Sequence, residues 1–237
     1  MTPPPPGPDA AAVARNVASV RARIEAAGGR DITLVAVTKT FPASAIAAAV
    51  AAGCRAIGEN YAQELVAKIA ELDRLSAPPG GEPAGHPEVH FIGHLQTNKV
   101  RMLAPVVTVW QSLDRENAID EVARRASGSR AFVQVNVSGE RQKSGCRPEE
   151  AAGLVRRGRD AGLRIEGLMT IGVMGDLVAA RAGFRELRSL ATSLDLPGCS
   201  MGMSDDLEIA VEEGATHVRV GSALFGPRVH DPGGDLR

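Results

Sequence analysis

The segment ITLVAVTKTFPASAIAAAVAAG, residues 32–53, contains one β-strand followed by one α-helix, and the rest of the chain repeats this order. Its first part is rich in β-branched and aliphatic residues and stops at Lys39, as is typical of a buried strand. Pro42 suits the first turn of a helix, and the alanine-rich run after it ends near Gly53. We therefore predict a strand over 32–38 and a helix over 42–53.

The same alternation of strand and helix continues to the C-terminal region. Further strands are expected at 56–58, 89–93, 106–110, 131–137, 165–171, 199–201 and 217–221. Helices are expected at 9–27, 61–75, 96–103, 114–126, 148–161, 178–194 and 204–213, with a short turn of helix ending at 225. Eight such units favour a parallel sheet closed into a single (β/α)8 barrel of the TIM type, with an extra N-terminal helix. No G-x-G-x-x-G follows the first strand, which disfavours a Rossmann domain.

The domain organisation follows from composition. Residues 1–8 are rich in proline and are expected to form a disordered tail, 9–228 form the barrel, and 229–237 form a C-terminal tail. Residues 76–87 are rich in proline and glycine, which is typical of a surface insertion. No second domain is expected in this composition.

Charge and cysteine content narrow the class of protein. The net charge is −1 and the pI is about 6.5, so no basic field exists to attract nucleic acid or an anionic membrane. No apolar run is long enough to span a bilayer, and the N-terminus lacks the features of a signal peptide. The three cysteines are far apart and show no C-x-x-C spacing. We expect a reduced cytoplasmic protein without a cysteine metal site, and a monomer.

Lys39 is the first candidate for chemistry. An apolar setting disfavours the ammonium form of a lysine, and the neutral amine is the form that condenses with an aldehyde to a Schiff base. Taken alone, a lysine at a strand end more often extends its side chain to water. The loops after the other strands decide between these alternatives, because function in such barrels lies on the loops after the strands.

The last two loops have the features of an anion site. Residues 200–204 (SMGMS) and Gly221-Ser222 each enter a helix, and main-chain N–H groups at a helix start bind anions. These are the usual phosphate positions of the fold. Asp205 and Asp206 would repel a phosphate unless they cap the helix or face outward.

Arg219 shares the face of Gly221 on the last strand, and it is expected near Lys39 if that face is the barrel interior. The alternative for Arg219 is an interior salt bridge, for example to Glu59. For Asn60 and Ser200 the alternative is a role in turns or capping. A lysine facing a phosphate site suits a ligand that carries both an aldehyde and a phosphate. Pyridoxal 5′-phosphate (PLP) is such a molecule.

Five motifs in this order resemble the YggS/PROSC family of pyridoxal phosphate homeostasis proteins: VAVTKTFP, IGENYAQE, HFIGHLQTNK, SMGMSDDLE and VRVGSALFG. The resemblance runs from about Leu34 to Arg228 and implies a barrel like the N-terminal domain of alanine racemases. It implies that Lys39 forms the Schiff base, that Asn60 lines the cofactor, and that Arg219 hydrogen-bonds the pyridine nitrogen. The phosphate would be held by Ser200, Met201, Gly202, Gly221 and Ser222. The loop from Ser138 to Gly145 fits the family only loosely and is given no role.

The resemblance implies a PLP carrier that maintains PLP homeostasis by buffering the free aldehyde and delivering it to apo PLP-dependent enzymes. An arginine on the pyridine nitrogen weakens the ring as an electron sink. Alanine racemases share such an arginine and compensate with a tyrosine from a second domain and the partner subunit, whereas here the single tyrosine is Tyr61. The alternatives are a PLP-dependent amino-acid racemase or lyase, and a sugar-phosphate enzyme that uses a Schiff-base lysine without a cofactor.

Overall fold

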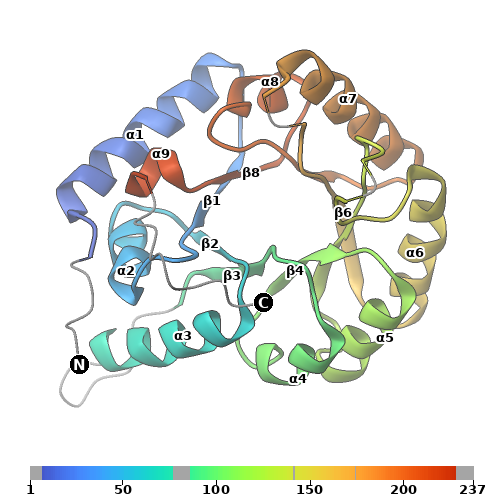
Figure 1. Ribbon diagram of the computed structural model, residues 1–237, viewed down its shortest axis with the longest axis horizontal. Coiled ribbons are helices and arrows are strands. Elements are labelled where there is room, and N and C mark those ends of the chain that lie inside the picture. Colours follow the sequence, from blue (N-terminus) through green and yellow to red (C-terminus); the bar gives the residue numbers. More distant parts are fainter. Residues whose placement is uncertain (1–6, 77–85, 141, 174, 228–237) are drawn as a thin grey trace.

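The computed structural model describes residues 7–76, 86–140, 142–173 and 175–227. Eight parallel strands form a closed barrel in chain order (Figure 1). The strands are β1 (Thr33–Val37), β2 (Ala56–Glu59), β3 (Glu88–Phe91), β4 (Val109–Leu113), β5 (Arg130–Gln134), β6 (Arg164–Met169), β7 (Gly198–Ser200) and β8 (His217–Val220). β1 pairs with both β2 and β8, which closes the ring. The predicted (β/α)8 barrel is confirmed.

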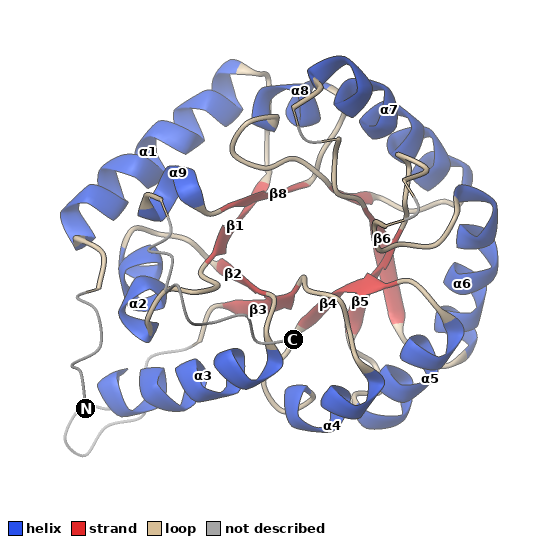
Figure 2. Cartoon of the chain, viewed as in Figure 1, coloured by secondary structure: helices blue, strands red, loops and turns tan. Residues whose placement is uncertain are grey.

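Helices surround the barrel, as Figure 2 shows in blue around the red strands. They are α1 (Ala10–Ala26), α2 (Ala43–Ala51), α3 (Ala62–Ser76), α4 (Val100–Leu103), α5 (Glu116–Arg125), α6 (Pro148–Asp160), α7 (Leu177–Ser193), α8 (Leu207–Glu212) and α9 (Ser222–Phe225), with a 3-10 turn over Thr97–Lys99. The extra N-terminal helix α1 packs against α2, α8 and α9. It buries the stripe Val13, Val17, Val20 and Ile24 that its sequence spacing predicts.

Most predicted elements are confirmed to within a few residues, but the fourth strand is misplaced. It was expected at 106–110 and lies at Val109–Leu113. The amides of Val106 and Val107 both donate to the Leu103 carbonyl, so these valines belong to the turn after α4. The helix expected over 114–126 begins at Glu116, and its N-cap is Arg115. The expectations for 1–8, 76–87 and 229–237 fall almost wholly outside the described residues.

The apolar residues form two cores. The larger one lies between the outer face of the strands and the helices. The smaller one fills the barrel and consists of Val109, Phe132 and Met169. A Cβ on Gly167 or Gly198 would lie 2.6 Å or 2.8 Å from the ring of Phe132, so the two glycines make room for this ring.

Other positions that face the barrel interior have polar side chains, and the candidate site lies among them at the carboxyl ends of the strands.

Three free cysteines, Cys54, Cys146 and Cys199, are buried. Within the described residues, no cluster of His, Cys, Asp or Glu has the arrangement of a metal site. None of the helices in the described part of the chain has the length and apolar character that crossing a membrane requires.

Candidate functional site

The predicted site residues gather at the carboxyl ends of four strands. Lys39 follows β1 and is partly buried, and Asn60 follows β2. Ser200 is the last residue of β7, and Met201 and Gly202 come directly after it. Arg219 lies in β8, Gly221 follows that strand, and Ser222 begins α9. All strands are parallel, so these residues share one face of the barrel.

The side chain of Arg219 is buried in the barrel interior. Its Nη1 donates to Ser200 Oγ at 2.7 Å, and its Nη2 donates to the carbonyl of Thr170 at 2.6 Å. Burial lowers the pKa of the guanidinium to about 10, and Asp206 partly opposes this effect. The group still carries its charge at neutral pH. The condition set for Arg219, that its face is the barrel interior, is met, and its contact with a ligand stays a prediction.

The alternative partner for Arg219, Glu59, is engaged elsewhere. Glu59 Oε1 accepts from Lys68 Nζ at 2.8 Å and from Thr38 Oγ1 at 2.7 Å. Burial raises the pKa of this carboxyl, and Lys68 counteracts the rise. Glu59 therefore belongs to a cluster beneath the Lys39 turn, and the salt bridge to Arg219 is not formed.

A line of hydrogen bonds runs from Arg219 toward the opposite end of the barrel. Ser200 Oγ donates to Gln111 Oε1 at 2.6 Å. Gln111 Nε2 lies 2.6 Å from His90 Nδ1, and His90 Nε2 lies 3.3 Å from Glu88. Because an amide nitrogen can only donate, His90 Nδ1 accepts and its proton resides on Nε2. Burial lowers the pKa of His90, which agrees with a neutral ring.

Asn60 lies in a tight part of the rim. A Cβ on Gly93 would lie 2.1 Å from the Asn60 carbonyl oxygen, so only glycine allows this approach. The side-chain Oδ1 of Asn60 is buried and has no hydrogen-bond partner among the described residues. A buried polar atom without a partner is costly, and a ligand group would satisfy it.

The loops after β7 and β8 meet at the rim. Gly202 has a φ of +91° and its carbonyl accepts from the Arg219 amide. Ser222 Oγ donates to Ser204 Oγ at 3.1 Å, and the Ala223 amide lies 3.4 Å from the same oxygen. The two loops are therefore joined through Ser204, which was named in the loop but not among the site residues.

Two of the predicted phosphate residues use their polar groups within the barrel wall. The Ser200 hydroxyl is held between Arg219 and Gln111, and the Met201 amide donates to the His217 carbonyl. Gly202, Gly221 and Ser222 lie at the rim. The contacts of all five to a phosphate stay predictions.

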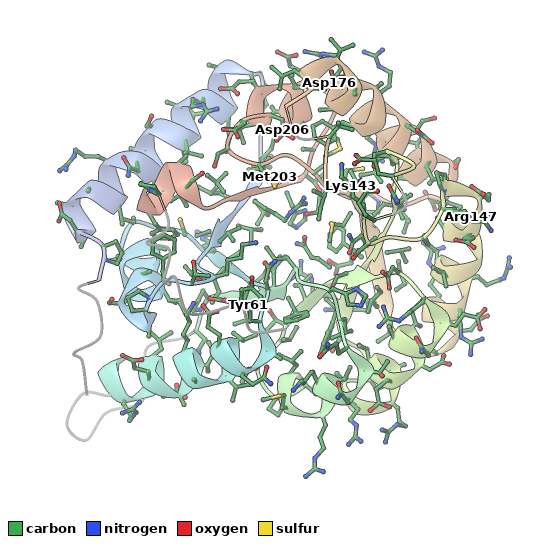
Figure 3. All side chains as sticks on the ribbon, in the orientation of Figure 1. Tyr61, Lys143, Arg147, Asp176, Met203 and Asp206 are labelled. Atoms are coloured by element: carbon green, nitrogen blue, oxygen red, sulfur yellow. The ribbon has the colours of Figure 1, made fainter. Side chains whose placement is uncertain are left out.

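The two acidic residues of the β7 loop differ in their surroundings. Asp206 is buried and its Oδ1 accepts from the Met203 amide at 2.5 Å, while Asp205 is exposed. Figure 3 shows Met203 nearer the barrel axis than Asp206. Asp206 is the N-cap of α8 but makes no side-chain cap hydrogen bond, so its carboxylate holds its own loop through the Met203 amide and does not cap the helix.

The described residues of the loop between Ser138 and Gly145 contact the segment that follows β6. Lys143 forms an ion pair with Glu140, and its Nζ lies 3.3 Å from the Gly172 carbonyl. Figure 3 shows Lys143 on the opposite side of the barrel opening from Tyr61, which is half exposed. No role for this loop was predicted.

Sequence reasoning missed Gln111 and Thr170, which hold Ser200 and Arg219. The misplaced fourth strand explains the first omission, because a strand ending at 110 leaves Gln111 in a loop. With the correct bounds, Val109 and Gln111 alternate onto the barrel interior. Thr170 contributes a main-chain carbonyl, for which the sequence has no signal.

Comparison with known proteins agrees with this geometry. The family model of the alanine racemase N-terminal domain matches residues 9–229. A pyridoxal phosphate homeostasis protein of Pseudomonas aeruginosa is 43% identical, with 91% of this chain and 96% of that protein covered. Another, of Aquifex aeolicus, is 39% identical over 82% of this chain and 86% of its own length. The structure of PipY of Synechococcus elongatus with PLP bound has a TM-score of 0.76 at 32% identity, covering 90% of this chain and 100% of that one.

The similarity covers the whole barrel and includes every strand that supplies a candidate site residue. By these matches, and by a barrel that brings a strand-end lysine to the same rim as two glycine-containing loops, the chain belongs to the family of pyridoxal phosphate homeostasis proteins, which shares its barrel with the alanine racemase N-terminal domain.

Proposed function

We propose that this protein binds PLP reversibly as a Schiff base on Lys39 and maintains PLP homeostasis by buffering the cofactor and delivering it to apo PLP-dependent enzymes. One observation carries the proposal: β1 and β8 are neighbours, with Val35 opposite Arg219. Lys39 and the Gly221-Ser222 loop follow these two strands. A single small molecule with an aldehyde and a phosphate can therefore reach both.

The rim fits such a ligand. Gly221 lies against β1, where a Cβ would be 3.2 Å from the Val37 carbonyl oxygen. Asn60 offers a buried acceptor without a partner, and Arg219 offers a buried cation. The PLP-bound relative PipY supports PLP as the occupant.

The expected reaction is a reversible condensation. The Lys39 nitrogen adds to the aldehyde carbon, and one water leaves as the carbon–nitrogen double bond forms. Addition of water returns the free aldehyde, and addition of another amine transfers it. Both release routes suit a carrier.

Arg219 favours a carrier over an enzyme that forms carbanions. With a pKa of about 10, the guanidinium keeps its proton at neutral pH. A ring nitrogen that accepts from this donor stays unprotonated, and an unprotonated ring is a weaker electron sink. A racemase or lyase would have to turn over its substrate although Arg219 keeps the ring nitrogen unprotonated.

The decisive experiment is borohydride reduction of the PLP-loaded protein followed by peptide mapping. We expect a yellow protein, a visible band that disappears on reduction, and one PLP-derived adduct on Lys39. Lys39→Ala should remove both band and adduct, whereas Lys99→Ala, on the loop after β3, should retain them. An adduct that persists on another lysine in Lys39→Ala would contradict the assignment.

The same preparation separates the alternatives. A panel of L-amino acids is incubated with the loaded protein and assayed for D-isomers and elimination products, and no turnover at ordinary enzyme rates is expected. Turnover at such rates would favour the racemase or lyase. A protein that stays colourless with PLP and instead forms a reducible adduct with a sugar phosphate would favour the cofactor-free enzyme.

The setting proposed for this function is the cytoplasm, where three buried thiols stay reduced. We also propose a monomer, and sedimentation of the purified chain should give a mass near 24.7 kDa.

A further inference from the structure

Charged side chains hold the main chain on both sides of Lys39. They are Glu59 at the end of β2, and Glu64 and Lys68 on α3, and we name these three residues the lysine clamp. Lys39 itself lies between Thr38, which is wholly buried, and Thr40, which is exposed. None of the three residues was a candidate for the site in the sequence.

The first half of the clamp acts on Thr38. Lys68 Nζ donates to the Thr38 carbonyl at 2.7 Å, and Thr38 Oγ1 donates to Glu59 Oε1 at 2.7 Å. Lys68 and Glu59 also pair with each other, and their side chains are only 7% and 0% exposed. Both the main chain and the side chain of the residue before Lys39 are thus held by buried charged groups.

The second half acts on Thr40. Its amide donates to Glu64 Oε1 at 2.5 Å, and the same oxygen lies 2.5 Å from Lys68 Nζ. Thr40 has a φ of +68°, in the left-handed region that is unfavourable for a β-branched residue. This turn needs an external partner to stay in place, and Glu64 supplies it. Lys68 therefore connects the residues on both sides of Lys39.

Stability alone does not account for this arrangement. Burial of charged groups is costly, and apolar residues of similar size often replace a buried ion pair without loss of stability. The clamp contacts the two neighbours of one residue, and that residue has the amine proposed to react. The reaction needs its nitrogen to approach an aldehyde carbon in a defined direction, and a misplacement of about 1 Å can cost up to about a hundredfold in rate.

We propose that Glu59, Glu64 and Lys68 are positioning residues that aim the Lys39 amine at the aldehyde of its ligand. This inference rests on the proposed function, because it presumes that Lys39 is the reacting amine. The clamp sets the direction in which the Lys39 side chain leaves the rim. It should therefore govern the rate of Schiff-base formation and leave the phosphate end of the site unaffected.

The test compares two ligands in full-length protein. PLP reports the rate of Schiff-base formation through the visible band. Pyridoxine 5′-phosphate has an alcohol in place of the aldehyde and reports noncovalent affinity only. Glu64→Leu should slow Schiff-base formation about ten- to a hundredfold while affinity for pyridoxine 5′-phosphate changes by less than about threefold.

Matched variants separate positioning from folding. Glu64→Gln keeps an oxygen for the Thr40 amide and should form the Schiff base at nearly the wild-type rate. Glu71→Leu makes the same change as Glu64→Leu at an exposed position of α3 and should have no effect. Lys68→Met alone leaves Glu59 buried without its cation, so the double variant Glu59→Gln/Lys68→Met is measured instead. It should form the Schiff base with PLP slowly and keep its affinity for pyridoxine 5′-phosphate.

Each outcome decides a specific point. Wild-type rates in Glu64→Leu and in the double variant, with Lys39 labelled by borohydride in both, would overturn the clamp and leave the proposed function standing. An equal loss of affinity for pyridoxine 5′-phosphate would also overturn it, because the clamp would then only support the fold. Wild-type protein without an adduct on Lys39 would overturn both proposals.

Discussion

Arg219 is buried and has a fixed orientation. Its two terminal nitrogens are held by Ser200 Oγ and the Thr170 carbonyl at 2.7 Å and 2.6 Å. A guanidinium has five donors in a rigid plane, so two fixed bonds determine where the others point. A lysine at this position would not reproduce the arrangement.

This orientation leads to a prediction for Arg219→Ala. Loss of a hydrogen bond to a charged group costs about 1.5–3 kcal/mol, which corresponds to a binding constant weaker by about ten- to a hundredfold. Covalent attachment to Lys39 should persist, since the amine is untouched. The measurement is a PLP titration followed by borohydride mapping, with the surface variant Arg101→Ala as control. Unchanged affinity would mean that Arg219 does not contact the ligand.

At the scale of elements, the connection from β7 to α8 depends on Gly202. Its φ of +91° is rarely adopted by other residues, and a Cβ would lie 2.4 Å from the Cβ of Ala210. Ala210 is a buried residue of α8. The glycine therefore lets the loop turn back so that its carbonyl can pair with the Arg219 amide.

We expect Gly202→Ala to destabilise the protein by about 2 kcal/mol or more, because backbone strain and the contact with Ala210 both oppose folding. PLP binding should weaken as well, since the rim of the proposed phosphate site would shift. Gly153→Ala is the matched control: this glycine lies in α6, and a Cβ there meets nothing within 4 Å. The control should gain about 0.5–1 kcal/mol. Urea unfolding measures both, and equal stabilities of the two variants would contradict the argument.

At the scale of the whole molecule, two histidines pack inside the barrel at the end opposite the site. The rings of His90 and His217 are 5.9 Å apart, and Phe132 lies against His217 at 5.0 Å. Burial lowers the pKa of His217 to about 3, and a proton on the neighbouring His90 or the charge of Arg130 acts in the same direction. Both rings are therefore neutral in the folded protein at neutral pH.

These histidines should make stability fall in mild acid. Between the ordinary histidine pKa of about 6.5 and the folded value, the unfolded chain binds the proton and the folded chain does not, so stability decreases as pH falls. From about pH 7.5 to pH 5.5, His217 with its pKa of about 3 costs about 1.4 kcal/mol of stability, and His90 acts in the same direction. His217→Gln should remove one such contribution from the free energy of unfolding.

The measurement is urea unfolding of wild type and variant at both pH values. Glu88 does not interfere, because its hydrogen bond to His90 lowers its pKa to about 2 and its contribution is lost only below about pH 4.5. The raised pKa of Glu59 has the opposite effect, because it makes the free energy of unfolding increase as pH falls. This effect is the same in wild type and in His217→Gln. Identical pH dependence in wild type and His217→Gln would show that His217 is not held neutral.

Local sequence patterns predicted most of this architecture. Strand and helix periodicity and Gly or Pro boundaries are short-range signals, and they led to eight units and to the correct rim for Lys39, Arg219 and Gly221. The prediction of the fourth strand was misplaced because Val106 and Val107, which follow α4, have the same high β-propensity as the residues of the true strand. Their amides complete the end of a helix instead. That error concealed Gln111.

The sequence by itself determined the elements, their order, and the motifs that identify the family, because these depend on neighbours along the chain. Only the tertiary structure decided that Arg219 pairs with Ser200 and not with Glu59, and that Lys68 holds Thr38. Such contacts join residues on different strands and helices. They exist only once the barrel closes and fixes which side chains share its interior and which helix faces the Lys39 turn.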